Sequence, residues 1–393
     1  MSLYLVTPPA GRGRKARRTP PGNQEAGVTA HRWEGGEAVR ESGPPWACSP
    51  SPPPSSPPPL WGNDYWTPHC AKDNRNIDTR LVNQPLGAYT VTGRNTLDLF
   101  CGAGGLSSGF ARSGYQVTGV DYLPVVPEIF RINGLGQARQ VNVHSQSVNG
   151  GYDLVMGGPP CRPWSAINVT RRRNAHSSFR LLARFVSHVV LNRPKAFLLE
   201  NVPPARLDVE RVAARLADYG YDFASRVVRY SDYGAPTSRR RLILFGTRRS
   251  DASGFFEELD RHRRPAATVR DAIGDLKQVE WGSIPDHIYP NFQTIEKYMD
   301  HYETGKYGWY RLSWDRPAPS FGNVIKTYTL HPSSWENSPP RVISIREALS
   351  LMGFERSFTF PEGMGMGKRY QMVADAVSPV FAQAAAEAVD QVL

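Results

Sequence analysis

The chain has 393 residues, a formal net charge of +11 and a pI near 9.6, so it can hold two domains plus tails and favours a polyanionic partner, nucleic acid first. A generally arginine-rich proteome is the alternative source of the charge. The four cysteines are too few and too scattered for a disulfide framework, and their spacing is not that of a metal site. The N-terminus lacks a signal-peptide pattern, and no apolar run approaches the roughly 20 residues that span a bilayer. We therefore expect a cytoplasmic protein without a metal.

Residues 1–60 differ from the rest of the chain. They contain basic GRGRKARR (11–18) and proline-rich SPSPPPSSPPP (49–59), offer little apolar surface to bury, and are predicted to form a disordered tail. The basic stretch is either solvated or a contact with nucleic acid. Residues 61–93 are mixed and aromatic, and we leave them as an unassigned extension.

From Asn95 onward, buried strands alternate with helices. The sequence predicts an α/β fold with a doubly wound, mainly parallel sheet. The predicted strands are 96–100, 116–121, 152–156, 195–200 and 241–246, and the predicted helices are 105–115 and 179–191.

The alternation of strands and helices stops over 251–340, which is rich in aromatic residues, prolines and turns. It returns afterwards: Ser344 and Glu347 form a capping-box sequence that opens a helix over 344–354. The final helix, 378–393, has Ser378 as its expected N-cap and Pro379 at its first position.

DLFCGAGG (98–105) joins the first strand to the first helix. Its glycines permit a tight turn and the close approach of a ligand, although Ser107 stands where a full dinucleotide motif has its third glycine. Asp121, at the end of the second strand, is either a ribose-binding acid or a surface or capping acid. Together these features favour an adenosine-containing ligand. The glycines are Gly102, Gly104 and Gly105.

GGPPCRPWS (157–165) places the thiol of Cys161 in a rigid loop after a buried strand. A structural cysteine needs no such frame, whereas a thiol that meets a substrate at a fixed angle does. Thiols react as thiolates, and we expect nearby cations such as Arg162 to lower the pKa of Cys161. A buried, inert cysteine is the alternative.

Glu200 ends the strand 195–200, where a carboxylate is costly to bury unless it is paired or functional. Burial would raise its pKa, which suits a proton donor. Arg239 and Arg241 are predicted to lie on one face of the strand that begins there, where two guanidiniums can steady an acid or a phosphate.

In this order, the segments resemble those of the DNA (cytosine-5)-methyltransferases over residues 95–393. The resemblance implies a Rossmann-like S-adenosylmethionine-dependent methyltransferase fold with a catalytic domain over 94–250. It also implies a smaller, irregular target-recognition domain over 251–340 and a segment, 341–393, that completes the catalytic domain. The similar blocks are DLFCGAGGLSSGF, GGPPCRPWS, ENV (200–202), YGAPTSRRR (233–241), RVISIREALSLMGF (341–354) and MVADAVSP (372–379).

Some positions depart from the family pattern. Arg162 and Thr237 stand where glutamine is frequent, Ala374-Asp375 replaces Gly-Asn, and Asn142 stands in place of the acid that holds adenine. These departures bear on cofactor affinity and loop details. The residues that carry the reaction remain: Cys161, Glu200, Arg239 and Arg241.

The resemblance implies a covalent mechanism on cytosine. The Cys161 thiolate adds to C6 and makes C5 enamine-like, while Glu200 hydrogen-bonds or protonates N3. C5 then takes the methyl group of S-adenosylmethionine, and loss of the C5 proton expels the thiol. A duplex hides the base, so it must be flipped out. The implied DNA-binding residues are Ser165, on a phosphate, and Arg171, Arg172 and Arg173, in a segment that closes over DNA.

For the cofactor, the resemblance implies that Phe100 and the glycine loop lie near the methionine and adenosine. Asp121 would hold the ribose and Tyr122 would lie on the adenine. Tyr122 and Leu181 are core residues in the alternative interpretation. The remaining implied pocket residues are Asn142, Pro160, Leu181, Asp375 and Val377.

Within 251–340, basic residues are expected to meet phosphates, and polar residues to read base edges in the major groove. The aromatic residues either form a small core or contact bases. They are Tyr298, Tyr302, Tyr307, Trp309 and Tyr310.

Three other functions fit parts of the sequence. A tRNA-directed cytosine methyltransferase would carry Cys-Phe-Thr in its recognition region, but 251–340 contains no cysteine. A nicotinamide-dependent oxidoreductase would be expected to keep the third glycine, and a silent DNA-binding protein would transfer no methyl group. A compact enzyme with one recognition region is typical of restriction–modification systems. We therefore expect a monomer that acts on double-stranded DNA and protects it from a cognate restriction endonuclease.

Overall fold

The computed structural model describes residues 93–393 except 163, 165–176, 250 and 337–338. The predicted tail over 1–60 lies outside these residues, as does the extension up to residue 92. Four of the predicted DNA-binding residues also lie outside them: Ser165, Arg171, Arg172 and Arg173.

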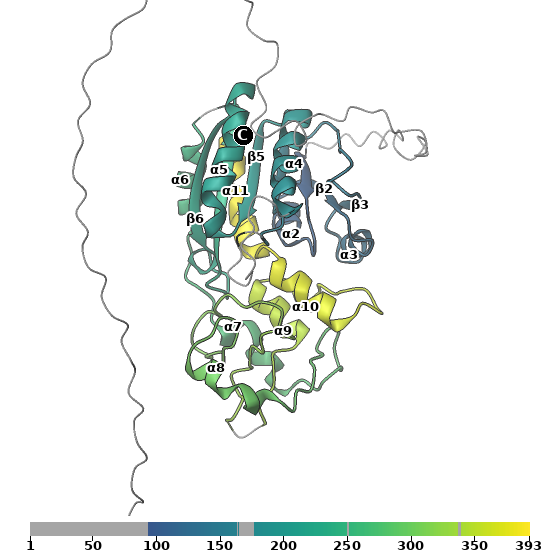
Figure 1. The fold of residues 1–393 in the computed structure, drawn as a ribbon, viewed down its shortest axis with the longest axis vertical. Coiled ribbons are helices and arrows are strands. Elements are labelled where there is room, and N and C mark those ends of the chain that lie inside the picture. Colours follow the sequence, from purple (N-terminus) through teal and green to yellow (C-terminus); the bar gives the residue numbers. More distant parts are fainter. Residues whose placement is uncertain (1–92, 163, 165–176, 250, 337–338) are drawn as a thin grey trace, which may run out of the picture. The chain divides into compact units, whose positions relative to one another are not determined.

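The described residues contain a seven-stranded sheet with helices packed on it (Figure 1). The strand order is β3-β2-β1-β4-β5-β7-β6, and only β7 runs against its neighbours. The predicted doubly wound, mainly parallel sheet is therefore confirmed. The strands are β1 (Asn95–Leu99), β2 (Gln116–Asp121), β3 (Gln137–Gln140), β4 (Leu154–Gly157), β5 (Ala196–Asn201), β6 (Asp222–Arg229) and β7 (Arg240–Thr247).

Helices pack on the sheet in two groups. In one group α2 and α6 each contact α11, and in the other α4 contacts α5. The helices are α2 (Gly105–Arg112), α3 (Val126–Asn133), α4 (Ser177–Asn192), α5 (Arg206–Ala213), α6 (Ser253–Arg261), α7 (Val269–Ile273), α8 (Met299–Glu303), α9 (Ile345–Met352), α10 (Met366–Asp375) and α11 (Pro379–Val392).

The side chains of β5 pack against helices on both faces of the sheet. Successive side chains of a strand point to opposite faces of the sheet. Phe197 therefore packs against Phe185 of α4, with ring centroids 6.4 Å apart, while Leu198 joins the core that includes α2 and α11. All six residues of β5 are buried, which explains the unbroken apolar run that predicted this strand.

Two strands, β3 and β6, were not predicted from the sequence because they lie at the edges of the sheet. β3 has the sequence QARQ and buries none of its residues, and β6 fully buries only Val228. Neither strand has the apolar run of a central strand. The helices α3 and α5 were missed as well.

The C-terminal helices begin as predicted. The Ser344 hydroxyl accepts a hydrogen bond from the Glu347 backbone N–H at 3.0 Å, and the Glu347 carboxylate accepts one from the Ser344 N–H at 2.7 Å. The final helix starts at Pro379 after its N-cap, Ser378, and packs against α2 and α6.

The segment 251–340 contributes to two places. Its first helix, α6, lies on the sheet, where Phe255 stacks on Phe245 of β7 with centroids 4.4 Å apart. The later part has short helices and an aromatic cluster in which Trp309 packs against Tyr298 and Tyr302. The small-core interpretation therefore fits these three residues. Tyr307 differs because it is 41% exposed.

The contact between α2 and α11 depends on Gly109. A Cβ atom at this position would lie 2.4 Å from the Ala382 Cβ and 2.4 Å from the Gln383 backbone nitrogen. We predict that Gly109→Ala lowers the free energy of unfolding by about 1–3 kcal/mol through overpacking. Urea denaturation measures this change.

The matched control is Gly254→Ala in α6, because a Cβ there meets nothing within 4 Å. This change should leave stability equal or raise it by up to about 1 kcal/mol. Equal stability of the two variants would contradict the packing argument.

Candidate active site

The two predicted loops leave neighbouring strands at the point where the strand order reverses. β1 leads into the glycine loop and β4 into the Cys161 loop, and these strands pair in parallel. Ligands of doubly wound sheets bind at the carboxyl ends of the strands, at this switch point. The topology therefore brings the predicted cofactor loop and the predicted nucleophile to one end of the sheet.

The glycine loop has an unusual backbone that Asp121 holds in place. Phe100, Gly102 and Gly104 all have positive φ angles, of 62°, 52° and 77°. A left-handed backbone at a non-glycine residue such as Phe100 is strained and is typical of functional sites. The Asp121 carboxylate accepts hydrogen bonds from the backbone N–H groups of Gly102 at 3.1 Å and Leu123 at 3.0 Å.

Ser107, which replaces the third glycine, has a partner in the core. Its hydroxyl donates a 2.6 Å hydrogen bond to the Asp98 carboxylate, and both side chains are buried. Burial raises the pKa of Asp98 to about 7, although the Ser107 hydrogen bond opposes this effect. The serine thus satisfies a buried acid at the end of β1.

The predicted cofactor residues lie in different surroundings. Gly105 lies against the last block, since a Cβ on it would be 2.1 Å from the Val377 carbonyl oxygen. Tyr122 is 64% exposed beside Asp121, so it is not a core residue. Asn142 is exposed after β3, and its side chain accepts a hydrogen bond from the His144 N–H. Two further residues are half-buried: Pro160 and Leu181.

Glu200 and Arg241 form a buried ion pair with an N–O distance of 2.9 Å. β7 runs antiparallel to β5, so the start of β7 lies beside the end of β5 that carries Glu200. Burial raises the pKa of Glu200, and Arg241 and Arg239 partly offset that rise. Tyr230 also donates to the Glu200 carboxylate, at 3.4 Å, and no sequence motif had indicated this residue.

Arg239 is buried beside this pair, with only 4% of its surface exposed. Its Nε atom has no hydrogen-bond partner in the described part of the chain. A buried guanidinium with an unsatisfied N–H is costly, so the site favours a ligand that brings an acceptor.

The electrostatics of Cys161 correct one prediction. Arg241 and Arg239 lower the pKa of the thiol as expected, but burial raises it by more, and Glu200 and Asp375 add to the rise. The pKa of Cys161 in the free protein is therefore above the ordinary value, because desolvation of the thiolate outweighs the two guanidiniums. Asp375, from the last block, acts on the thiol and accepts a 2.9 Å hydrogen bond from Gln371.

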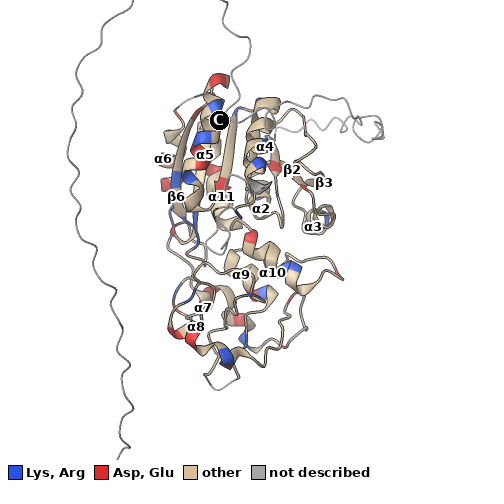
Figure 2. Cartoon of the chain, in the orientation of Figure 1, with Lys and Arg blue, Asp and Glu red and all other residues tan. Residues whose placement is uncertain are grey.

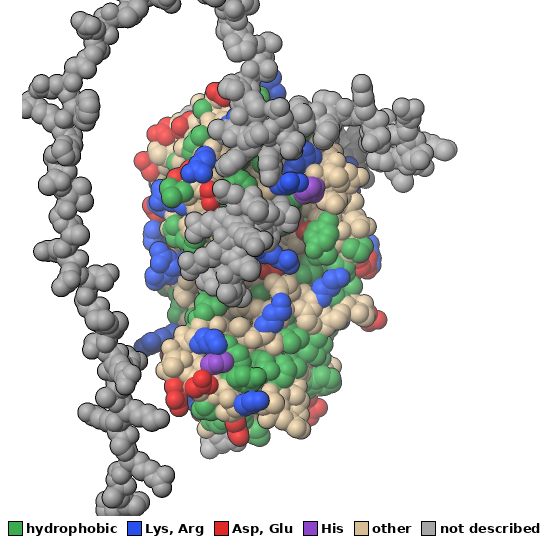
Figure 3. All heavy atoms as spheres, viewed as in Figure 1, with side chains coloured by type: hydrophobic (Ala, Val, Ile, Leu, Met, Phe, Trp, Pro, Cys, Tyr) green, Lys and Arg blue, Asp and Glu red, His purple; other side chains and the backbone are tan. Residues whose placement is uncertain are grey.

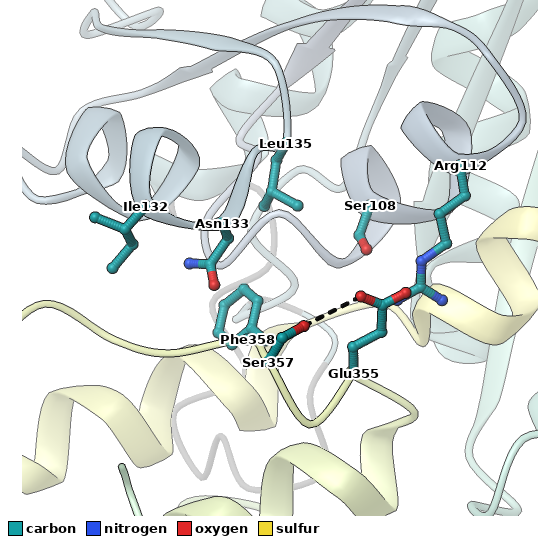
Figure 4. Close-up of a pocket in the computed structure, with 8 residues that line it drawn as sticks. All are labelled: Ser108, Arg112, Ile132, Asn133, Leu135, Glu355, Ser357 and Phe358. Atoms are coloured by element: carbon teal, nitrogen blue, oxygen red, sulfur yellow. Dashed lines mark hydrogen bonds and ion pairs between the residues drawn. The ribbon is translucent and has the colours of Figure 1, made fainter.

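A separate cavity of about 180 Å³ lies between α2, the end of α3 and residues 355–358 (Figure 4). Arg112 and Glu355 form an ion pair of 2.9 Å beside it. The predicted site residues do not line this cavity, so we do not assign it to the reaction.

Comparison with known proteins places the chain in a family. The model of the C-5 cytosine-specific DNA methylase family matches residues 94–391. The chain belongs to this family. The enzyme class predicted from sequence, a DNA cytosine-5-methyltransferase, is thereby confirmed, and methyltransferases in general use S-adenosylmethionine.

Relatives of this methylase are spread over several organisms. A type II methyltransferase of Haemophilus parahaemolyticus is 29% identical over 343 residues, covering 75% of this chain and 86% of the relative. The solved structure of the Entamoeba histolytica methyltransferase EhMeth has a TM-score of 0.60 at 18% identity, covering 77% of this chain and 100% of that one. An Escherichia coli prophage structure titled as a putative DNA modification methyltransferase gives 0.59 at 22%, covering 76% and 99%.

The charges around Cys161 predict opposite pKa shifts in two variants. Asp375→Asn removes a carboxylate that disfavours the thiolate, so the pKa of Cys161 should fall and alkylation near neutral pH should become faster. Arg241→Gln removes the largest favourable charge and should raise the pKa and slow alkylation. The measurement is the pH dependence of iodoacetamide labelling of the Cys161 peptide, by mass spectrometry. Shifts of the same sign in both variants would contradict this account.

Proposed function

We propose that the methylase modifies C5 of cytosine in one short double-stranded DNA sequence, through a covalent Cys161 adduct on a flipped-out base. One observation carries the proposal. Cys161 follows β4, Glu200 ends β5 and Arg241 begins β7, yet their charges act on one another at one end of the sheet. A thiol, a buried acid and two guanidiniums form a site for addition to a polar ring.

Each of these side chains has a distinct role. Cys161 adds to C6 of the cytosine as the thiolate, and the two guanidiniums of Arg239 and Arg241 favour that form against the effect of burial. Glu200 hydrogen-bonds or protonates N3 and takes up the charge that addition pushes into the ring. Arg241 fixes Glu200 through their ion pair, and the unpartnered Nε–H of Arg239 is available to an acceptor on the substrate. A base finally takes the C5 proton, and the electron pair of that C–H bond re-forms the C5–C6 double bond and expels Cys161 as its thiolate.

The glycine loop and its neighbours fit a bound S-adenosylmethionine. The Asp121 carboxylate is 8% exposed and anchored by backbone N–H groups, so its remaining lone pairs suit donors such as ribose hydroxyls. The exposed ring of Tyr122 suits an adenine face. When bound, S-adenosylmethionine supplies the methyl group that C5 receives. The other residues proposed to hold it are Phe100, Gly102, Gly104, Gly105, Asn142, Pro160, Leu181, Asp375 and Val377.

The part of 251–340 that follows α6 is proposed to recognise DNA, because α6 itself packs on the catalytic sheet. Backbone hydrogen bonds join Ala318 to Pro236 and Ser238, directly before Arg239, at 2.9 and 2.8 Å. Tyr307, which shares a 3.3 Å hydrogen bond with Ser320 inside the segment, is close enough to Arg239 to act on the pKa of that guanidinium. These contacts support a recognition segment that touches the catalytic residues.

Surface charge agrees with a shared role in DNA binding. Lys and Arg residues occur on helices that pack on the sheet, such as α4 and α5, and on α10 (Figure 2). On the face in Figure 3 they are spread among other residue types rather than gathered in one patch. This distribution supports phosphate contacts from several elements. We also propose that four residues of the segment after Cys161 contact DNA: Ser165, Arg171, Arg172 and Arg173.

The biological role is proposed from the relatives. Several are named type II methyltransferases, and the one from Haemophilus parahaemolyticus is matched over 86% of its length. We infer a cytoplasmic, monomeric enzyme of a restriction–modification system that protects DNA from a cognate endonuclease. In the described part of the chain, no helix has the length and apolar character of a membrane span.

Cys161→Ser should abolish methyl transfer, because a hydroxyl is a far weaker nucleophile than a thiol. Binding of S-adenosylmethionine and DNA should persist, since the rest of the site is unchanged. Transfer of labelled methyl groups to plasmid DNA and isothermal titration with the cofactor measure the two properties. Substantial turnover by the purified variant would refute the nucleophile assignment.

A chimera tests where sequence choice resides. Because α6 packs on the sheet, the chimera keeps α6 and replaces 269–340 with the matching segment of a relative that methylates a different site. Bisulfite sequencing of DNA from expressing cells should show methylation at the donor's site. An active chimera that still methylates the original site would place specificity elsewhere.

A further inference from the structure

The loop that carries Cys161 is fixed on both sides of the thiol. Before the thiol, the Asn201 side chain donates a 3.1 Å hydrogen bond to the Pro159 carbonyl. After it, the indole Nε1–H of Trp164 donates to the Asp208 carboxylate at 2.7 Å. The Trp164 backbone N–H also closes a turn on the Cys161 carbonyl at 2.9 Å.

The two residues that hold the loop, Asn201 and Asp208, belong to the stretch of chain that carries Glu200. Asn201 is the last residue of β5, directly after Glu200, and Asp208 lies in the first turn of α5. Only a short 3₁₀ turn, Pro203–Ala205, separates the strand from that helix. The two hydrogen bonds therefore connect the nucleophile to the acid that must act on the same ring.

The contact between Trp164 and Asp208 is shielded and directional. Trp164 is 4% exposed and its ring packs on Phe179 of α4, with centroids 5.9 Å apart. The Asp208 side chain is 14% exposed. Packing alone would bury any aromatic ring at this position, whereas the indole adds an N–H donor, absent from phenylalanine, that fixes the ring's orientation against a carboxylate.

We propose that Trp164 and Asp208 are positioning residues, whose hydrogen bond holds the Cys161 sulfur in register with Glu200 during attack on the cytosine. This inference rests on the proposed function. Small misplacement of a nucleophile is expensive for the chemical step and has little effect on binding. The pair should therefore act on kcat and leave the KM for DNA almost unchanged.

The variants separate the hydrogen bond from packing and charge. Trp164→Phe keeps a ring against Phe179 and removes the donor, whereas Asp208→Leu removes the acceptor from the partner helix. Asp208→Asn keeps an oxygen acceptor and loses the charge. Leu207→Ala is the matched control on α5, because Leu207 is 74% exposed.

The experiment measures kcat, the KM for DNA and thermal stability of each full-length variant with saturating S-adenosylmethionine. Trp164→Phe and Asp208→Leu should each lower kcat by about tenfold or more, a size expected of misplaced reacting groups, with KM within about twofold. The double variant should be no slower than either single variant, because both remove the same contact. Asp208→Asn should keep most of the activity, and Leu207→Ala should match the wild type.

If the wild-type protein transfers methyl groups, three outcomes would overturn the inference. They are wild-type kcat in Trp164→Phe and Asp208→Leu, additive losses in the double variant, and an Asp208→Asn variant as slow as Asp208→Leu. An absence of methyl transfer by the wild-type protein would instead overturn the proposed function.

Discussion

The buried ion pair between Glu200 and Arg241 is the constraint on which the site depends. Its two side chains are only 10% and 11% exposed, so each charge has lost most of its water and relies on the other. Removing one partner of such a pair typically costs about 3–5 kcal/mol, because the other is left buried and uncompensated. The pair also requires β7 to run against β5, since only that direction brings Arg241 to the end of the strand that carries Glu200. One reversed strand in an otherwise parallel sheet thus serves the site directly.

Burial and four charged groups act on the pKa of Cys161 in competing directions. Burial and two carboxylates raise the thiol's pKa, and two guanidiniums lower it. The outcome is a thiol that stays protonated more readily than a free cysteine. Desolvation of the thiolate therefore outweighs the two guanidiniums in the free protein. Asp375 contributes to this balance, and it is one of the positions where the sequence departs from the family pattern.

Residues of the segment 251–340 also form hydrogen bonds next to the candidate active site. Ala318 pairs with the backbone directly before Arg239, and Asn323 donates to Gln371, which in turn donates to Asp375. The segment 251–340 is therefore joined to the guanidinium side of the site and to the last block.

The sequence by itself determined the strand and helix alternation, the capping box at Ser344, the glycine loop and the candidate residues Cys161 and Glu200. These features are local, because apolar runs, turn chemistry and short motifs leave their mark on adjacent residues. The tertiary structure decided the rest. The edge strands β3 and β6 carry little apolar pattern. The partners Tyr230 and Asp208 stand far along the chain from the groups they contact, as does Asp375 from the thiol on whose pKa it acts. The sign of the pKa shift at Cys161 also came from packing, since burial depends on how the whole chain encloses the thiol and no local motif records it.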